Sequence, residues 1–287
     1  MACAWLLVCV PYCMILELDG PASDMRALQA WRSISPELCA LWNESVPVTE
    51  WAGVVIGVDG ADAGRVVELS LPSQRLTGIV PAEIGGLTTL QTLDLSDNYL
   101  TSVPAELGSL TALQTLDLDW NQLTSVPAEL GRLTSLQKLS LSGNQLTSVP
   151  AGLGGLTALH TLDLSRNRLT SVPAELGGLT ALTTLYLYSN RLTSVPSELG
   201  NLTALKTLYL RNNKLRTVPA ELGRLTKLTT LVLENNKLRS VPAELGALSA
   251  LRRLILYDNP ALAGAAVLCS PRHMMAYNSI NKGTNCV

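Results

Sequence analysis

The stretch LTSVPAELGSLTALQTLDLDWNQ, residues 100–122, decides the fold, because the chain goes on to repeat it almost unchanged. Residues 123–145 read LTSVPAELGRLTSLQKLSLSGNQ, and residues 146–168 read LTSVPAGLGGLTALHTLDLSRNR. A fixed period of this length is typical of an array of stacked structural repeats rather than of a single compact core. The first question for this chain is therefore what one repeat builds.

Asparagines mark the period of the array. They recur every 23 residues, and Gln74 holds the equivalent place one unit earlier, 24 residues before Asn98. This spacing defines nine units with the pattern L-x-x-L-x-L-x-x-N-x-L. The eight asparagines are Asn98, Asn121, Asn144, Asn167, Asn190, Asn213, Asn236 and Asn259.

Each unit contains two kinds of local pattern. In LQTLDLSDN, residues 90–98, leucines alternate with polar residues, which predicts a short strand with one buried face. In VPAELG, residues 103–108, a proline is placed to start a helical turn and a glycine to end it. A unit is therefore predicted to be a strand, a bend, one helical turn and a return. One such unit buries too little surface to fold alone, so successive units have to stack.

The L-x-x-L-x-L-x-x-N-x-L units resemble the leucine-rich repeat family over roughly residues 65–262. The 23-residue units are similar to the Ras-group or plant intracellular type of repeat. The resemblance implies an α/β solenoid with a curved parallel sheet on its concave face and one short helical turn per repeat on its convex face. It also implies that the asparagines form a ladder, each bonding backbone groups of a neighbouring turn.

The ends of the array differ from its middle. LWNESVPVTEWAGVV followed by GRVVELSL resembles the N-terminal cap of plant-type, algal and bacterial repeat proteins, although Glu50 and Val55 stand where plant extracellular caps have cysteines. The expected division is an apolar leader or N-terminal segment (1–22), an N-terminal cap (23–64), the repeat array (65–262) and a C-terminal tail (263–287).

The cellular compartment stays open. The first 16 residues carry no charge and are too short for an easy membrane span, so they are either a secretory leader or an apolar segment packed on the first repeat. Secretion or membrane targeting is one alternative and a cytoplasmic location is the other. The six cysteines all lie outside the repeats, and pairing of Cys269 with Cys286 is not decided by the sequence.

Catalytic chemistry is not indicated. The two histidines are far apart in sequence, and the chain contains no phosphate-binding loop, nucleophile elbow or zinc-protease motif. We therefore expect no enzyme activity, no cofactor and no metal site. A net charge of −2 gives no case for nucleic-acid binding. Charge is nevertheless unevenly distributed, with a balance of −10 over residues 1–159 and of +6 over residues 160–260.

The residues that vary between units fall at strand positions that point out of the concave face. Early strands carry an acidic patch, which is expected to be solvated surface charge and consists of Asp94, Asp97, Asp117, Asp119 and Asp163. Late strands carry aromatic and aliphatic residues, and Trp120 is an isolated aromatic residue in an earlier unit. The predicted partner-binding residues are Trp120, Tyr186, Tyr188, Tyr209, Arg211, Val232, Glu234, Ile255 and Tyr257.

Tyrosine and arginine are common anchors of binding hot spots, and apolar groups on an uncovered sheet face have no structural task. The alternative is drift among residues that suit strands. The sequence thus predicts a non-catalytic scaffold that binds another protein or peptide on its concave face, in signalling. A secreted or cell-surface ligand-binding array and a regulatory fragment of a receptor kinase are the alternatives. A membrane association would require the N-terminal segment to act as an anchor, and oligomeric state is open.

Overall fold

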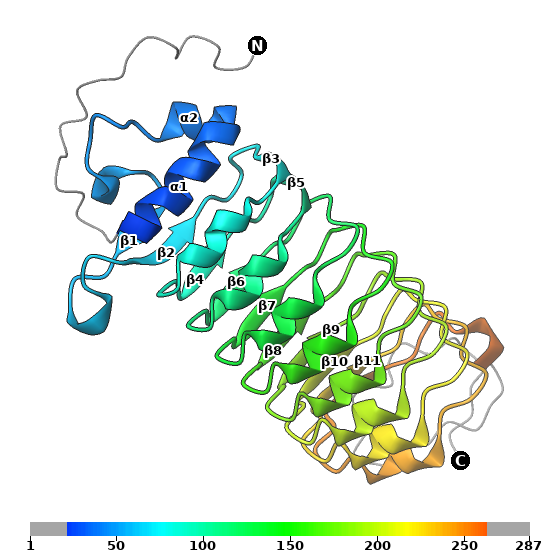
Figure 1. Cartoon of the computed structure of the whole chain (residues 1–287). Coiled ribbons are helices and arrows are strands. Elements are labelled where there is room, and N and C mark those ends of the chain that lie inside the picture. The colour runs from blue at the N-terminus through cyan, green and yellow to red at the C-terminus, as the bar shows by residue number, and fades with distance from the viewer. Residues whose placement is uncertain (1–21, 263–287) are drawn as a thin grey trace.

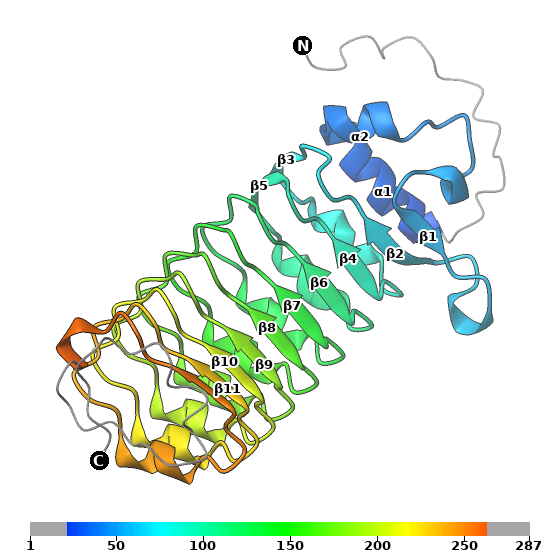
Figure 2. The same ribbon diagram turned by 180° about the vertical axis from the view of Figure 1, so that it is seen from behind.

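The computed structural model describes residues 22–262, which form one elongated stack of similar turns (Figure 1). Each turn adds one strand to a common sheet and one short helical turn to the opposite face, so the helical turns lie in front of the sheet in Figure 1 and behind it in Figure 2. The predicted solenoid is confirmed. Residues 1–21, residues 263–287 and therefore the pair Cys269 and Cys286 lie outside the described residues.

The main sheet has ten strands. Nine of them run parallel, and β1 pairs antiparallel with β2 at the N-terminal edge. Its strands are β1 (Val54–Ile56), β2 (Val66–Ser70), β4 (Thr92–Asp94), β6 (Thr115–Asp117), β7 (Lys138–Ser140), β8 (Thr161–Asp163), β9 (Thr184–Tyr186), β10 (Thr207–Tyr209), β11 (Thr230–Val232) and β12 (Arg253–Ile255). A separate two-stranded sheet joins β3 (Thr77–Ile79) to β5 (Tyr99–Ser102) in the first two units.

Equivalent residues of successive units pair with each other across the parallel strands. Leu162 of β8, for example, pairs with Leu139 of β7 and with Leu185 of β9. Since side chains alternate between the two faces of a strand, this register sends the central leucines into the interior, where those from Leu69 to Leu231 are 0 % exposed and Leu254 of the last strand is partly buried. The core is thus a continuous column of leucine layers.

The predicted helical turns are 3-10 turns. Each begins after a proline with extended backbone and closes with a leucine N–H that donates to the carbonyl three residues earlier. The turns of the array are η3 (Ala82–Gly86), η4 (Ala105–Ser109), η5 (Ala128–Arg132), η6 (Ala151–Gly155), η7 (Ala174–Gly178), η8 (Ser197–Asn201), η9 (Ala220–Arg224) and η10 (Ala243–Ala247). Three further turns are η1 (Val48–Glu50), η2 (Gly60–Asp62) and η11 (Pro260–Leu262).

The glycine in each AELG segment allows these turns to pack closely. A Cβ atom on Gly108 would lie only 2.3 Å from the carbonyl oxygen of Glu129 in the next turn. The same approach recurs at Gly177, where a Cβ atom would lie 2.4 Å from the carbonyl oxygen of Glu198. This contact explains why each of these turns keeps the glycine.

Two α-helices cover the N-terminal end of the stack, α1 (Ala22–Ile34) and α2 (Pro36–Leu41). The α1 carboxylate of Asp24 is 1 % exposed and accepts hydrogen bonds from the Arg65 guanidinium and from the Val66 N–H at 2.8 Å. Trp42 and Trp51 stack behind these helices with ring centroids 5.1 Å apart. The first leucine layer is therefore shielded from water, as an open stack requires.

The structure places each repeated asparagine at the bend after its strand, where it joins two units. The Oδ1 atom of Asn167 accepts from the Leu146 N–H at 3.0 Å, and its Nδ2 donates to the Leu141 carbonyl at 2.8 Å. Both partners belong to the preceding unit. The same two bonds recur at all eight positions, and each of these asparagines is less than 9 % exposed.

We predict that Asn167→Ala lowers the free energy of unfolding by about 1–3 kcal/mol, because it leaves the buried Leu146 N–H without an acceptor. Urea unfolding followed by circular dichroism measures the change. Asn201→Ala is the matched control, since Asn201 is exposed on η8 and the equivalent position of η10 is already Ala247. Equal stability of the two variants would contradict the structural role of the ladder.

Candidate protein-binding face

The concave face is the outer side of the parallel sheet, and its composition is set by one residue of each strand. The register aligns these residues in a single column across the units. From the N-terminal to the C-terminal end, the column reads Ser70, Asp94, Asp117, Ser140, Asp163, Tyr186, Tyr209, Val232 and Ile255. Because each column residue follows a buried leucine, its side chain points away from the core.

Three tyrosines form a cluster on this face. Tyr186 ends β9, Tyr209 ends β10, and Tyr188 lies two residues after the end of β9. The ring centroids of Tyr186 and Tyr209 are 5.3 Å apart, and Tyr186 meets Tyr188 edge-on at 6.3 Å. All three are partly exposed. Burial raises the pKa of the Tyr186 hydroxyl, and the neighbouring Tyr209 adds to this shift. The tyrosines predicted from the sequence as a contiguous patch are therefore brought together.

Arg211 connects this cluster to the last strands. Its guanidinium carbon lies 5.0 Å from the centroid of the Tyr188 ring, and its side chain is 3.6 Å from the Glu234 carboxylate. A hydrogen bond to Glu234 also raises the pKa of the Tyr257 hydroxyl. The Nε atom of Arg211 is buried and has no hydrogen-bond partner among the described residues. The cluster thus contains a cation whose hydrogen-bonding capacity is only partly used.

Trp120 is not isolated, contrary to the expectation from its position in the sequence. The Arg166 guanidinium carbon lies 5.4 Å from the Trp120 ring and 5.9 Å from the Tyr188 ring, so it bridges the two aromatics. Gly143 makes this possible, because a Cβ atom there would lie 2.7 Å from the Trp120 ring. Arg166 was not identified from the sequence. The sequence feature that could have identified it is its position directly before a ladder asparagine, which is also the position of Trp120.

One predicted member of the patch does not present its side chain to solvent. Val232 is only 2 % exposed. Its register neighbours, Tyr209 and Ile255, carry larger side chains, and the valine is recessed between them. The expectation that the Val232 side chain is exposed on this face was therefore wrong. Ile255 and Tyr257 remain partly exposed.

The acidic residues of the early strands form a hydrogen-bonded cluster. Asp119 accepts from the Ser140 hydroxyl at 2.8 Å and from the Ser142 N–H at 2.5 Å. Asp117 pairs with Lys138 at 2.9 Å. Burial, together with the nearby charge of Asp117, raises the pKa of Asp119 to about 6. Burial also raises the pKa of the Asp163 carboxyl.

Two of the predicted acidic residues lie toward the N-terminal side of this cluster. Asp94 is next to Asp117 in the strand register and accepts hydrogen bonds from the backbone and hydroxyl of Ser96. Asp97 lies in the bend with a φ of 55° and accepts from the Ser73 hydroxyl at 2.7 Å. Asp97 is therefore on the rim rather than on the strand surface.

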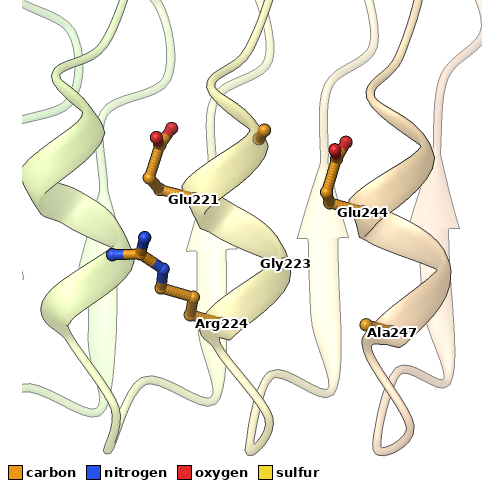
Figure 3. Close-up of a pocket in the computed structure, with 6 residues that line it drawn as sticks. Glu221, Gly223, Arg224, Glu244 and Ala247 are labelled. Atoms are coloured by element: carbon orange, nitrogen blue, oxygen red, sulfur yellow. The ribbon is translucent and has the colours of Figure 1, made fainter.

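A small hollow occurs on the opposite, convex face between η9 and η10. It measures about 290 Å³ and is lined by Ala220, Glu221, Gly223, Arg224, Glu244 and Ala247. Figure 3 shows Glu221 and Arg224 on one turn and Glu244 on the next. These residues belong to the repeated AELG segment, so the hollow follows from the spacing of the turns and contains none of the variable strand residues.

Residues 22–262 contain neither a metal-ligand cluster nor a membrane-spanning helix. This part of the chain holds no group of three or more histidine, cysteine, aspartate or glutamate side chains arranged to bind a metal ion. Among the same described residues, no helix has both the length and the apolar character needed to cross a membrane.

Comparison with known proteins identifies the repeat. A family model described as leucine rich repeat matches residues 134–192, 180–238 and 203–260, and a model of a leucine-rich repeat region matches residues 68–148. Together the two models span more than half of the chain. A probable leucine-rich repeat receptor-like protein kinase of Arabidopsis thaliana is 41% identical over 88 residues, which are 30% of this chain and 9% of that kinase.

Solved structures match over a larger part of the chain. A leucine-rich repeat protein of Leptospira interrogans has a TM-score of 0.65 and 39% identity, over 74% of this chain and 52% of that one. The leucine-rich repeat ectodomain of the Arabidopsis receptor kinase HAESA, in complex with an N-terminally extended IDA peptide hormone, has a TM-score of 0.69 and 32% identity. That match covers 82% of this chain and 41% of the ectodomain.

The raised pKa of Asp119 predicts a pH dependence of stability. Between pH 3.8 and about 6 the folded state holds a proton on Asp119 that the unfolded state has released, so the free energy of unfolding falls as pH rises through this window. Asp119→Asn removes this titration. The melting temperature of the variant should therefore rise relative to that of wild type as pH increases from 3.8 to above 6. A difference that does not change with pH would show that Asp119 titrates normally.

Proposed function

Since the chain belongs to the leucine-rich repeat family, we propose that it is a non-catalytic recognition protein that binds a partner protein or peptide on its concave face. The observation that carries this proposal is the cluster of Tyr186, Tyr188, Tyr209 and Arg211, which lies on a sheet surface that is not part of the core. Tyrosine and arginine supply large contact area and directional hydrogen bonds, and both are enriched among hot-spot residues.

The geometry of the cluster favours an extended segment of the partner. The patch spans the four strands from β9 to β12, which at about 4.8 Å per strand is roughly 15 Å across. An extended peptide laid across the strands would contact one side chain of each strand in turn. A partner carbonyl or carboxylate would satisfy the remaining donors of Arg211. The acidic cluster around Asp117 and Asp119 would favour a basic group at the other end of the bound segment.

Receptor-type relatives support a second candidate function. The Arabidopsis kinase is a receptor-like protein, and the HAESA ectodomain is bound to a peptide hormone. The present chain spans 9% of that kinase and 41% of that ectodomain. We therefore propose, as the second candidate, that it acts as a ligand-binding array of a receptor or secreted protein. In either case residues 23–64 would serve as the N-terminal cap of the array and residues 263–287 as its C-terminal tail.

Panning the whole chain against a displayed library of random linear peptides tests where binding occurs. The double change Tyr186→Ala with Tyr209→Ala should weaken the selected peptides by about 2 kcal/mol or more, which is roughly 30-fold in Kd, because it removes two anchors. Calorimetry on synthetic copies of the peptides measures this. The melting temperature should fall by only a few degrees, because neither side chain enters a leucine layer.

Two single changes provide controls. Tyr99→Ala removes an exposed tyrosine that lies on β5, outside the main sheet, and Glu175→Ala removes an exposed residue of η7 on the convex face. Neither should change the affinity of the selected peptides. If a control weakens binding as much as the double variant does, or if the double variant binds normally, recognition takes place elsewhere on the molecule.

A further inference from the structure

The rising flank is the segment of each unit between the ladder asparagine and the 3-10 turn. Its first residue hydrogen-bonds to the preceding unit: the Arg191 N–H donates to the Leu169 carbonyl at 2.8 Å, and the Lys237 N–H donates to the Leu215 carbonyl at 2.9 Å. These bonds stack the flanks at the spacing of sheet strands, about 4.8 Å. The flank is therefore a flat, regular surface beside the concave face.

Alternate residues of the flank point outward. The leucine in second place is 0 % exposed in each unit, so the residues in first and third place both face solvent. In the four flank segments that begin at residues 168, 191, 214 and 237, six of these outward residues are basic. We call them the basic flank, and they are Arg168, Arg191, Lys214, Arg216, Lys237 and Arg239.

The charges of the basic flank are not neutralised by the part of the chain that the structure describes. All six residues are exposed, and none forms an ion pair with a carboxylate of residues 22–262. The four flank segments contain no aspartate or glutamate. Outside the described residues, the sequence offers only Glu17 and Asp19 as acidic side chains. Residues 1–21 and 263–287 thus hold two acidic side chains against the six cations of the flank.

The basic character is concentrated in one half of the flank. In the preceding units the first position holds Arg75 in the first unit and then Tyr99, Gln122 and Gln145, which are uncharged. The backbone hydrogen bonds are the same in both halves, as the Gln122 and Gln145 N–H groups show. The repeat architecture consequently does not require cations at these positions. Like charges on neighbouring flanks repel each other, so their accumulation on one surface favours an external anion.

The chemistry of the remaining flank residues selects among anionic partners. Besides the cations, the outward and turn-facing positions of these units carry hydroxyl groups, from Thr170, Ser171, Thr193, Ser194, Thr217 and Ser240. The flank offers no exposed aromatic or aliphatic side chain in these units, because its leucines and valines are buried or partly buried. Insertion into a lipid surface uses apolar side chains, and stacking on nucleobases uses aromatic ones.

We propose that the basic flank binds a linear sulfated polysaccharide laid across the stacked units. Such a chain presents sulfate groups that accept from guanidinium and ammonium donors, and hydroxyl groups that match the serines and threonines. The cations stand in two rows, with Arg216 and Arg239 forming the second row and their backbones joined by a hydrogen bond of 3.2 Å. Two rows of cations fit a polymer with charges on both sides better than a polyuronate with one charge per sugar. This site is separate from the concave face.

Binding of a heparin oligosaccharide to the full chain tests the proposal. We compare wild type with the quadruple variant Arg191→Gln, Lys214→Gln, Arg216→Gln and Lys237→Gln. The variant should bind at least about tenfold more weakly, and the slope of log Kd against log salt concentration should fall by about three to four, since each lost contact reduces it by a little under one. Circular dichroism should show unchanged folding, because these side chains are exposed.

A second quadruple variant with the same change in net charge is the matched control. It alters four exposed cations that lie outside the basic flank, on the 3-10 turn η9 or between a 3-10 turn and the following strand. The changes are Lys206→Gln, Arg224→Gln, Lys227→Gln and Arg252→Gln. This control and the Tyr186→Ala, Tyr209→Ala variant should both bind heparin within about twofold of wild type. An equal loss in the matched control would mean that heparin senses only net charge, and would overturn the assignment.

Competing ligands decide the partner class. Polygalacturonate should bind more weakly than heparin, and neutral dextran should not bind. Binding of polygalacturonate as tight as that of heparin would contradict the requirement for sulfate. Flank-dependent binding of phosphatidylserine vesicles or of polyglutamate, without heparin binding, would replace the polysaccharide by a lipid surface or an acidic peptide.

Discussion

Pairing of successive units in one fixed register is the constraint on which the rest of the structure depends. The strand hydrogen bonds set the distance between units, and the ladder asparagines lock the bend, since each amide accepts from one backbone group of the preceding unit and donates to another. A shift of one residue in any strand would turn its leucines to solvent and its polar residues to the core. The strand register, the leucine layers and the asparagine ladder therefore depend on one another.

This constraint also determines which positions are free to carry function. On the convex side, a Cβ atom at Gly108 would lie 2.3 Å from the carbonyl of the next turn, so this position of the turn requires glycine. On the concave side and on the rising flank, the outward positions touch no core layer. The same backbone can thus present aspartates in early units, tyrosines in later ones and a row of cations beside them. Binding properties change along the array while the fold stays the same.

The architecture could be predicted from the sequence because its determinants are local and repeated. The alternation in LQTLDLSDN and the proline and glycine of the VPAELG segment each act within one unit. The site was harder to predict, because its contacts cross units. Trp120 reaches Arg166 only because Gly143 between them lacks a side chain. Val232 is covered although its position in the repeat equals that of the partly exposed Tyr209, and the size of neighbouring side chains is what separates them.

Deletion of one whole unit tests the central claim most directly. Removing residues 145–167 joins Asn144 to Arg168 and restores the pattern of the repeat. We expect this protein to fold and to unfold cooperatively with a modestly lower midpoint, because stability is nearly a sum over units and their interfaces. Removing only residues 145–156 leaves a strand without its flank and 3-10 turn, and should abolish the cooperative transition although fewer residues are lost. If circular dichroism shows the smaller deletion to be the more stable, stacking in register is not what holds this chain together.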